Sequence, residues 1–194
     1  TWVIFTADHG EMLGDHHMSQ KNLFFEGSAH VPLLIMPPQG RSLPHNISVE
    51  APTDLVDIYP TILAMAGLSS PVSVSGKNLL EPVPMDRMFF GNSLNKNFCV
   101  MEEKVKLVYS AVGDHVLLFD LNTDPMEQHN LAEDPDWQER KAKLWKLLLE
   151  HTAQYTPEAL DENGQFLTYE APRFPGDMPG RWFGFHYPAY YVDT

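Results

Sequence analysis

The chain begins with an apolar run that ends in charged residues. Residues 2–5 are Trp-Val-Ile-Phe, and Thr-Ala-Asp-His-Gly follows at positions 6–10. Large and β-branched residues bounded by a polar stretch predict a strand that is buried on both faces. Ligands of open α/β sheets bind at the carboxyl ends of the strands, so Asp8 and His9 are expected to face one crevice. A carboxylate and an imidazole placed together are candidate ligands for a divalent metal ion.

A polar loop and a second strand follow. Residues 10–20 contain two glycines and the neighbouring histidines His16 and His17, without helical periodicity, which indicates an active-site loop. Lys21 comes directly after this loop. Residues 31–36, Val-Pro-Leu-Leu-Ile-Met, predict another buried strand that ends at a Pro-Pro pair.

These motifs together resemble a known family. The run T-A-D-H-G-E-M-L-G-D-H-H, then Lys21 twelve residues after His9, then F-F-E-G-S-A-H-V-P-L-L-I, is similar to the second half of the sulfatases in the alkaline phosphatase superfamily. Residues 53–67 resemble the family's D-x-x-P-T helix segment, and residues 118–131 resemble its late D-P-x-E-x-x-N-L turn. The resemblance covers roughly residues 1–150. It implies the C-terminal part of an α/β sheet domain, followed by a small antiparallel sheet packed with a helix.

The resemblance also implies roles for single residues. Asp8 and His9 would bind a calcium ion, with manganese or another divalent metal as the alternative. Lys21 would contact a sulfate oxygen and offset the charge that develops on the leaving group; the alternative is an ordinary solvated lysine. His16 would donate a hydrogen bond to the substrate or protonate the leaving alcohol, unless it is simply exposed.

Other parts of a sulfatase site are expected outside this sequence. The family's nucleophile is a formylglycine made from Cys or Ser in a C/S-x-P-x-R motif, and it lies in the N-terminal half together with two more acidic metal ligands. Cys99, the only cysteine, lies in N-F-C-V-M, which has neither the Pro nor the Arg. Because the sequence opens at Thr1 in mid-strand, we expect a C-terminal piece of a larger enzyme. The missing N-terminal half would be its partner, and the piece by itself would be inactive.

Composition narrows the possible partners. A formal net charge of −13 argues against a nucleic-acid surface, which needs clustered Lys and Arg. It does not exclude an anionic substrate, since a bound divalent ion dominates its local field. No apolar run is long enough to predict a membrane span. Oligomerisation and cellular compartment are left open by the sequence.

The remaining pattern predicts three regions. Residues 1–84 would complete the α/β catalytic domain. Residues 85–154 would form the small subdomain, with strand-like runs at 87–90, 98–101, 106–109 and 115–119 that favour an antiparallel sheet, and with a helix at 136–154. Residues 155–194, rich in aromatics, Pro and Gly, would form an ordered tail.

Three functions fit these observations. The first is hydrolysis of a sulfate ester by the metal-dependent parent enzyme. The second is hydrolysis of a phosphonate monoester or phosphodiester, because relatives with that activity share the D-H-G turn and the lysine spacing. The third is a non-catalytic binding or scaffold domain, which loss of the C/S-x-P-x-R motif upstream would favour.

Overall fold

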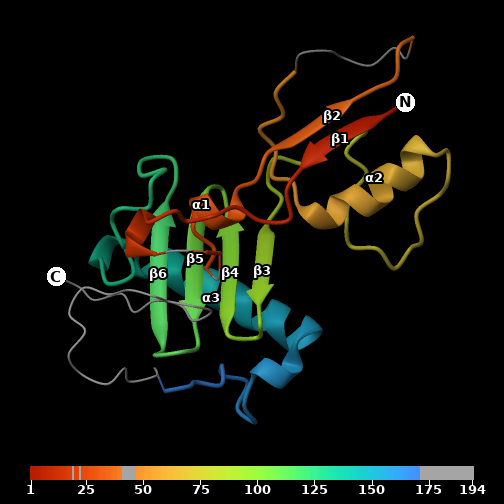
Figure 1. Cartoon of the computed structure of the whole chain (residues 1–194). Coiled ribbons are helices and arrows are strands. Elements are labelled where there is room, and N and C mark those ends of the chain that lie inside the picture. The colour runs from red at the N-terminus through yellow and green to blue at the C-terminus, as the bar shows by residue number, and fades with distance from the viewer. Residues whose placement is uncertain (19, 22, 41–46, 171–194) are drawn as a thin grey trace. The chain divides into compact units, whose positions relative to one another are not determined.

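The computed structural model describes residues 1–18, 20, 21, 23–40 and 47–170 (Figure 1). The chain divides into two compact units: residues 1–8 with 31–89, and residues 9–30 with 90 onward. The predicted border at residues 84 and 85 lies near the change of unit at Phe89, but segment 9–30 groups with the second unit and not with the first. Of the predicted aromatic tail, residues 171–194 lie outside the described residues.

The first unit contains a two-stranded antiparallel sheet. Strand β1 (Val3–Thr6) pairs with β2 (Leu33–Met36), so that Val3 faces Met36 and Phe5 faces Leu34. Because cross-strand partners and residues two apart share a face, these four side chains form one apolar face. Their exposed fractions are 45%, 61%, 59% and 58% for Val3, Phe5, Leu34 and Met36. Both strands were predicted correctly, but the prediction that they are buried on both faces was wrong. Apolar side chains indicate a surface that is stabilised by burial, and no described residue buries this face.

A short helix follows in the same unit. Helix α2 (Ile58–Met65) comes directly after a 3₁₀ turn at Leu55–Asp57. Gly67 follows the helix with φ +74°, a left-handed conformation that glycine adopts without steric cost, and this confirms the predicted helix end.

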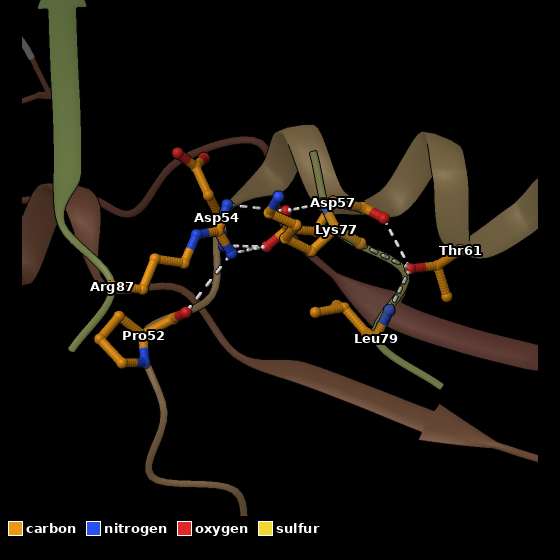
Figure 2. A network of polar contacts seen from close by, with 7 residues as sticks. All are labelled: Pro52, Asp54, Asp57, Thr61, Lys77, Leu79 and Arg87. Atoms are coloured by element: carbon orange, nitrogen blue, oxygen red, sulfur yellow. Dashed lines mark hydrogen bonds and ion pairs between the residues drawn. The ribbon is translucent and has the colours of Figure 1, made fainter. Parts of the chain in front are cut away.

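A buried ion pair ties the start of α2 to a distant part of the first unit (Figure 2). Asp57 is fully buried, and its carboxylate accepts two hydrogen bonds from the Arg87 guanidinium at 2.5 and 2.8 Å. It also accepts the backbone N–H groups of Asp54 and Lys77. Thr61 adds a second link, because its hydroxyl accepts the N–H of Leu79. The irregular segment that leads to Arg87 is thereby fixed to α2 by polar contacts.

The second unit is built on a four-stranded antiparallel sheet in the order β3-β4-β5-β6. Its strands are β3 (Phe89–Ser93), β4 (Asn97–Glu102), β5 (Val105–Ser110) and β6 (His115–Asp120). Each of the four runs predicted from the sequence overlaps one strand of this antiparallel sheet, although the first strand begins at Phe89 and not at residue 87.

Helix α3 (Gln138–Tyr155) packs on this sheet, as predicted (Figure 1). Its buried residues Leu144, Leu148 and Thr152 are four apart and lie along one stripe of the helix. The two leucines join alternate residues of β5, Leu107 and Tyr109, in the hydrophobic core.

The other residues of β5 point to the opposite face of the sheet. Lys106 is 3% exposed and reaches Phe24 and Glu26, which belong to segment 9–30. Phe119 of β6, the register partner of Lys106, lies next to Phe25, with ring centroids 5.8 Å apart. The sheet is thus covered on one face by α3 and on the other by the segment that carries the predicted site residues, including the short helix α1 (Glu26–Ala29) (Figure 1).

Within the described ranges, we find no helix with the length and apolarity required to cross a membrane.

Candidate active site

His9 and Lys21 meet in the second unit. The Lys21 ammonium contacts the Nε2 atom of the His9 ring, and the Nδ1 atom of the same ring lies 2.8 Å from the carbonyl oxygen of Gly10. An ammonium only donates hydrogen bonds, so it selects the tautomer in which Nδ1–H donates to the carbonyl and Nε2 keeps its lone pair. The structure therefore brings together two of the four site residues predicted from the sequence.

The backbone of segment 9–30 fixes both residues. The N–H of Gly10 donates to the carbonyl of Ser28 at 2.7 Å, and the N–H of Glu11 donates to that of Gly27 at 2.9 Å. The Ser28 hydroxyl donates to the carbonyl of Lys21 at 2.9 Å. Residues 27 and 28 are thus the backbone platform for both His9 and Lys21.

Gly10 is required for this arrangement. A Cβ atom at this position would lie 2.1 Å from the carbonyl oxygen of Gly27, far inside van der Waals contact. A side chain would therefore push the His9 segment off its platform, which gives a steric reason for the glycine of the D-H-G motif.

Asp8 is exposed and directly precedes His9 in the chain. It belongs to the first compact unit, whereas His9 belongs to the second. Among the described residues, no group of three or more His, Cys, Asp or Glu side chains is arranged to hold a metal ion. The donor chemistry of His9 nevertheless suits a metal, because metal-bound histidines usually donate their other ring N–H to a carbonyl or carboxylate.

His16 has different neighbours. Its ring stacks on Phe25, with centroids 4.2 Å apart and an interplanar angle of 16°, and its Nε2 atom lies 3.2 Å from the carbonyl oxygen of Met126. His16 and His17 both have positive φ angles, 50° and 57°. The contacts of His16 thus join the loop to the turn at Met126 and do not link it to His9 or Lys21.

A buried charge cluster, which we call the Lys106 cluster, was missed by the sequence analysis. The Lys106 ammonium lies 2.5 Å from Glu26 Oε1, 2.7 Å from Glu127 Oε1 and 2.8 Å from the carbonyl oxygen of Phe24. Glu127 is 1% exposed, and its other oxygen accepts the N–H of Glu26 at 2.7 Å. His30 also pairs with Glu26, with its Nδ1 atom 2.8 Å from Glu26 Oε2. The one sequence signal that could have revealed this cluster is Lys106 itself, a lysine between apolar residues of a buried strand.

Burial governs the protonation of this cluster. It raises the pKa of Glu127 above its usual value, although the neighbouring ammonium opposes the shift. Burial by itself would lower the pKa of Lys106, but negative groups around it, Glu127 and Glu26 among them, outweigh this and raise the pKa. Lys106 is therefore held in its charged form.

Comparisons with known proteins place the fold in a family. The family model described as N-sulphoglucosamine sulphohydrolase, C-terminal, matches residues 14–154. Arylsulfatase K of Xenopus laevis is 34% identical over 152 residues, covering 68% of this chain and 28% of that protein. The choline-sulfatase of Rhizobium meliloti is 35% identical over 191 residues, covering 89% and 36%. The crystal structure of the phosphonate monoester hydrolase of Agrobacterium radiobacter superposes with a TM-score of 0.61 at 33% identity, covering 84% and 38%. The chain thus spans about a third of the length of each relative.

Proposed function

This chain belongs to the sulfatase family, and from that premise we propose that it forms the C-terminal part of an enzyme that hydrolyses sulfate esters. The observation that carries the proposal is the contact between the Lys21 ammonium and Nε2 of His9. A cation held beside a metal-type ligand atom is the arrangement that a sulfate group needs, since its oxygens must be neutralised from more than one side.

Lys21 would bind a sulfate oxygen. Its side chain is exposed, so the ammonium can exchange the His9 nitrogen for an anionic oxygen without leaving a buried charge unpaired. In the transition state, negative charge grows on the ester oxygen and on the sulfuryl group, and the ammonium would stabilise it. His16, by its observed contacts, would support the loop from the Met126 side; a direct proton transfer from His16 stays a prediction.

Asp8 and His9 would hold a divalent metal ion together with ligands from outside this chain. Such an ion would act as a Lewis acid on the substrate oxygens. The Asp8 carboxylate suits calcium, while the His9 nitrogen is more typical of manganese and other transition metals. The lone pair of His9 cannot serve the ammonium and a metal at once, so if His9 held an ion, the Lys21 ammonium would be available for an anionic oxygen. Metal content of the purified full-length protein, and of its Asp8→Ala variant, measures this directly.

The nucleophile would come from the rest of the enzyme. The N-terminal half, the partner inferred from the resemblance, would bring the formylglycine and the other metal ligands. The apolar face formed by Val3, Phe5, Leu34 and Met36 supports such a partner, because a face of this kind is stable only when covered. The 194-residue chain by itself is expected to show no turnover of an aryl sulfate, and measurable turnover would contradict this division of labour.

Substitution of Lys21 tests the proposal. In the full-length protein, Lys21→Ala should lower kcat for an aryl sulfate by about 10²- to 10³-fold, the usual loss for one charge-stabilising donor. Lys146→Ala is the matched control, since its side chain is 77% exposed on α3. Equal activity of the two variants would show that Lys21 is an ordinary surface lysine.

A second candidate is hydrolysis of phosphonate monoesters. It is favoured by the 33% identity to the Agrobacterium radiobacter enzyme over 84% of this chain. Phosphonate monoesters and sulfate esters both place anionic oxygens where Lys21 could reach them. Paired aryl sulfate and aryl phosphonate substrates decide between the two: the substrate with the larger kcat/KM names the activity.

A further inference from the structure

We propose that Lys106 and Glu127 are positioning residues that hold the loop carrying His9 and Lys21 against the sheet. The inference rests on the proposed function in one respect only, that His9 and Lys21 belong to the active site. Neither Lys106 nor Glu127 has a role in the proposed chemistry.

The first step of the argument is where the cluster binds. Lys106 contacts the carbonyl oxygen of Phe24 and the carboxylate of Glu26, and Glu127 accepts the N–H of Glu26. Two of these three contacts are to backbone atoms. They therefore fix the path of the chain at residues 24–26 and not merely the rotamer of one side chain.

The second step is what depends on residues 24–26. They lead directly into Gly27 and Ser28, whose carbonyls accept the N–H groups of Glu11 and Gly10, and the Ser28 hydroxyl holds the carbonyl of Lys21. The backbone of residues 27 and 28 thus positions His9 and Lys21, and Lys106 and Glu127 hold the residues that lead into it. A shift of the platform would move both side chains together.

The third step is the rigidity of the anchor. Lys106 is the second residue of β5 and is 3% exposed, and Glu127 is 1% exposed. Glu127 adopts φ +55°, in a turn where its N–H donates to the carbonyl of Asp124. The positive φ of Glu127 and the burial of its charge both cost free energy of folding, and the contacts that Glu127 makes must offset this cost. Hydrophobic residues could fill the same space, but they could not hold a backbone carbonyl and a backbone N–H.

This last difference gives a test that separates positioning from mere stability. The double variant Lys106→Met/Glu127→Leu in the full-length protein removes both charges, and such apolar replacements of a buried pair often leave stability unchanged or raise it. The anchors of Phe24 and Glu26 are lost all the same. We expect the amides of Gly10, Glu11 and Glu26 to exchange with solvent at least about tenfold faster. We also expect kcat to fall by about 10²-fold, with KM within about threefold of wild type.

The matched control is Glu102→Gln. It removes the pair between Glu102 of β4 and Arg140 of α3, at 2.7 Å, which belongs to the same unit but lies away from segment 9–30. It should lower Tm without changing exchange at Gly10 and Glu11. The single variant Glu127→Gln keeps an oxygen for the Glu26 amide and should give a smaller effect in the same direction, which keeps the test informative if the double variant fails to fold.

The outcomes are distinct. The positioning role is overturned if amide exchange at Gly10 and Glu11 is unchanged in the double variant. It is also overturned if a variant of Lys106 or Glu127 that has the wild-type Tm has the wild-type kcat as well. If neither the wild type nor any variant hydrolyses sulfate or phosphonate esters, but exchange at these amides rises as expected, the positioning role stands and the proposed function fails.

Discussion

Lys21 and Lys106 show how surroundings decide what a lysine can do. Lys21 is exposed and contacts the ring of His9 and not a carboxylate, so its ammonium can move to an incoming anion at little cost. Lys106 is buried beside two carboxylates, so any movement would leave charges unpaired in a nonpolar environment. The first is suited to binding a ligand, and the second to holding a structure in place.

The ion pair of Asp57 predicts that the stability of the fold depends on pH. Burial would raise its pKa, but the Arg87 guanidinium and the N–H groups of Lys77 and Asp54 outweigh burial and hold the pKa below the ordinary value of an aspartate. The unfolded chain therefore takes up a proton at Asp57 more readily than the folded chain. The stability contributed by this group is complete above about pH 4 and is lost as the pH falls through the lower folded pKa.

Asp57→Asn should accordingly reduce the free energy of unfolding by about 3 kcal/mol at pH 7, because it leaves Arg87 without its partner. The difference from wild type should shrink at pH 3. Urea unfolding of both proteins at the two pH values measures it, with Glu139→Gln on the exposed side of α3 as the control for loss of one negative charge. A difference that stays constant between pH 7 and pH 3 would contradict the assigned role.

At the scale of elements, α3 is the main apolar cover of the four-stranded sheet. Leu148 is 1% exposed and belongs to the core cluster. Leu148→Ala should lower the free energy of unfolding by about 2–5 kcal/mol, through lost burial and the cavity left behind. Denaturant titration compares it with Lys146→Ala, two residues earlier in the helix, which should change stability by less than about 0.5 kcal/mol. Similar losses for the two variants would show that α3 does not pack as described.

The elements of the second unit could be predicted from the sequence because their signals are local. Gly or Asn separates the first strand-like run from the second and the third from the fourth, and the charged residues 102–104 separate the second from the third. Leu144 and Leu148 of α3 are four residues apart. The Lys106 cluster could not be predicted in this way, since Lys106 and Phe24 are 82 residues apart and only the folded sheet brings them together. For the same reason, the apolar run at residues 2–5 predicted a strand correctly but not its exposure. Periodicity tells which residues avoid water, and not which surface covers them.

At the scale of the whole molecule, the two units differ in how they bury apolar groups. All buried hydrophobic residues of the described chain except Ala51 belong to the second unit. The first unit exposes a complete strand face and is held instead by the polar network around Asp57. We therefore expect the second unit to be the more resistant to unfolding when the chain is studied by itself.

The exposed strand face predicts self-association. The isolated chain should form concentration-dependent oligomers through Val3, Phe5, Leu34 and Met36, and Phe5→Lys/Leu34→Lys should abolish them, as seen by sedimentation velocity. In the full-length protein the same double variant should instead lower stability, because the face would be covered there. A pair at exposed polar sites, Glu139→Gln/Glu162→Gln, changes the net charge by the same amount and is the control. Oligomers that persist in the Phe5 and Leu34 variant would place the association elsewhere.

The single cysteine of this chain can report how often the four-stranded sheet opens. Cys99, in β4, is fully buried, and burial raises its pKa to about 12, so at neutral pH it is protonated and inaccessible to a thiol reagent. A dye that reacts with thiols can label it only during those moments when the four-stranded sheet opens. The labelling rate would then count these openings without any engineered probe.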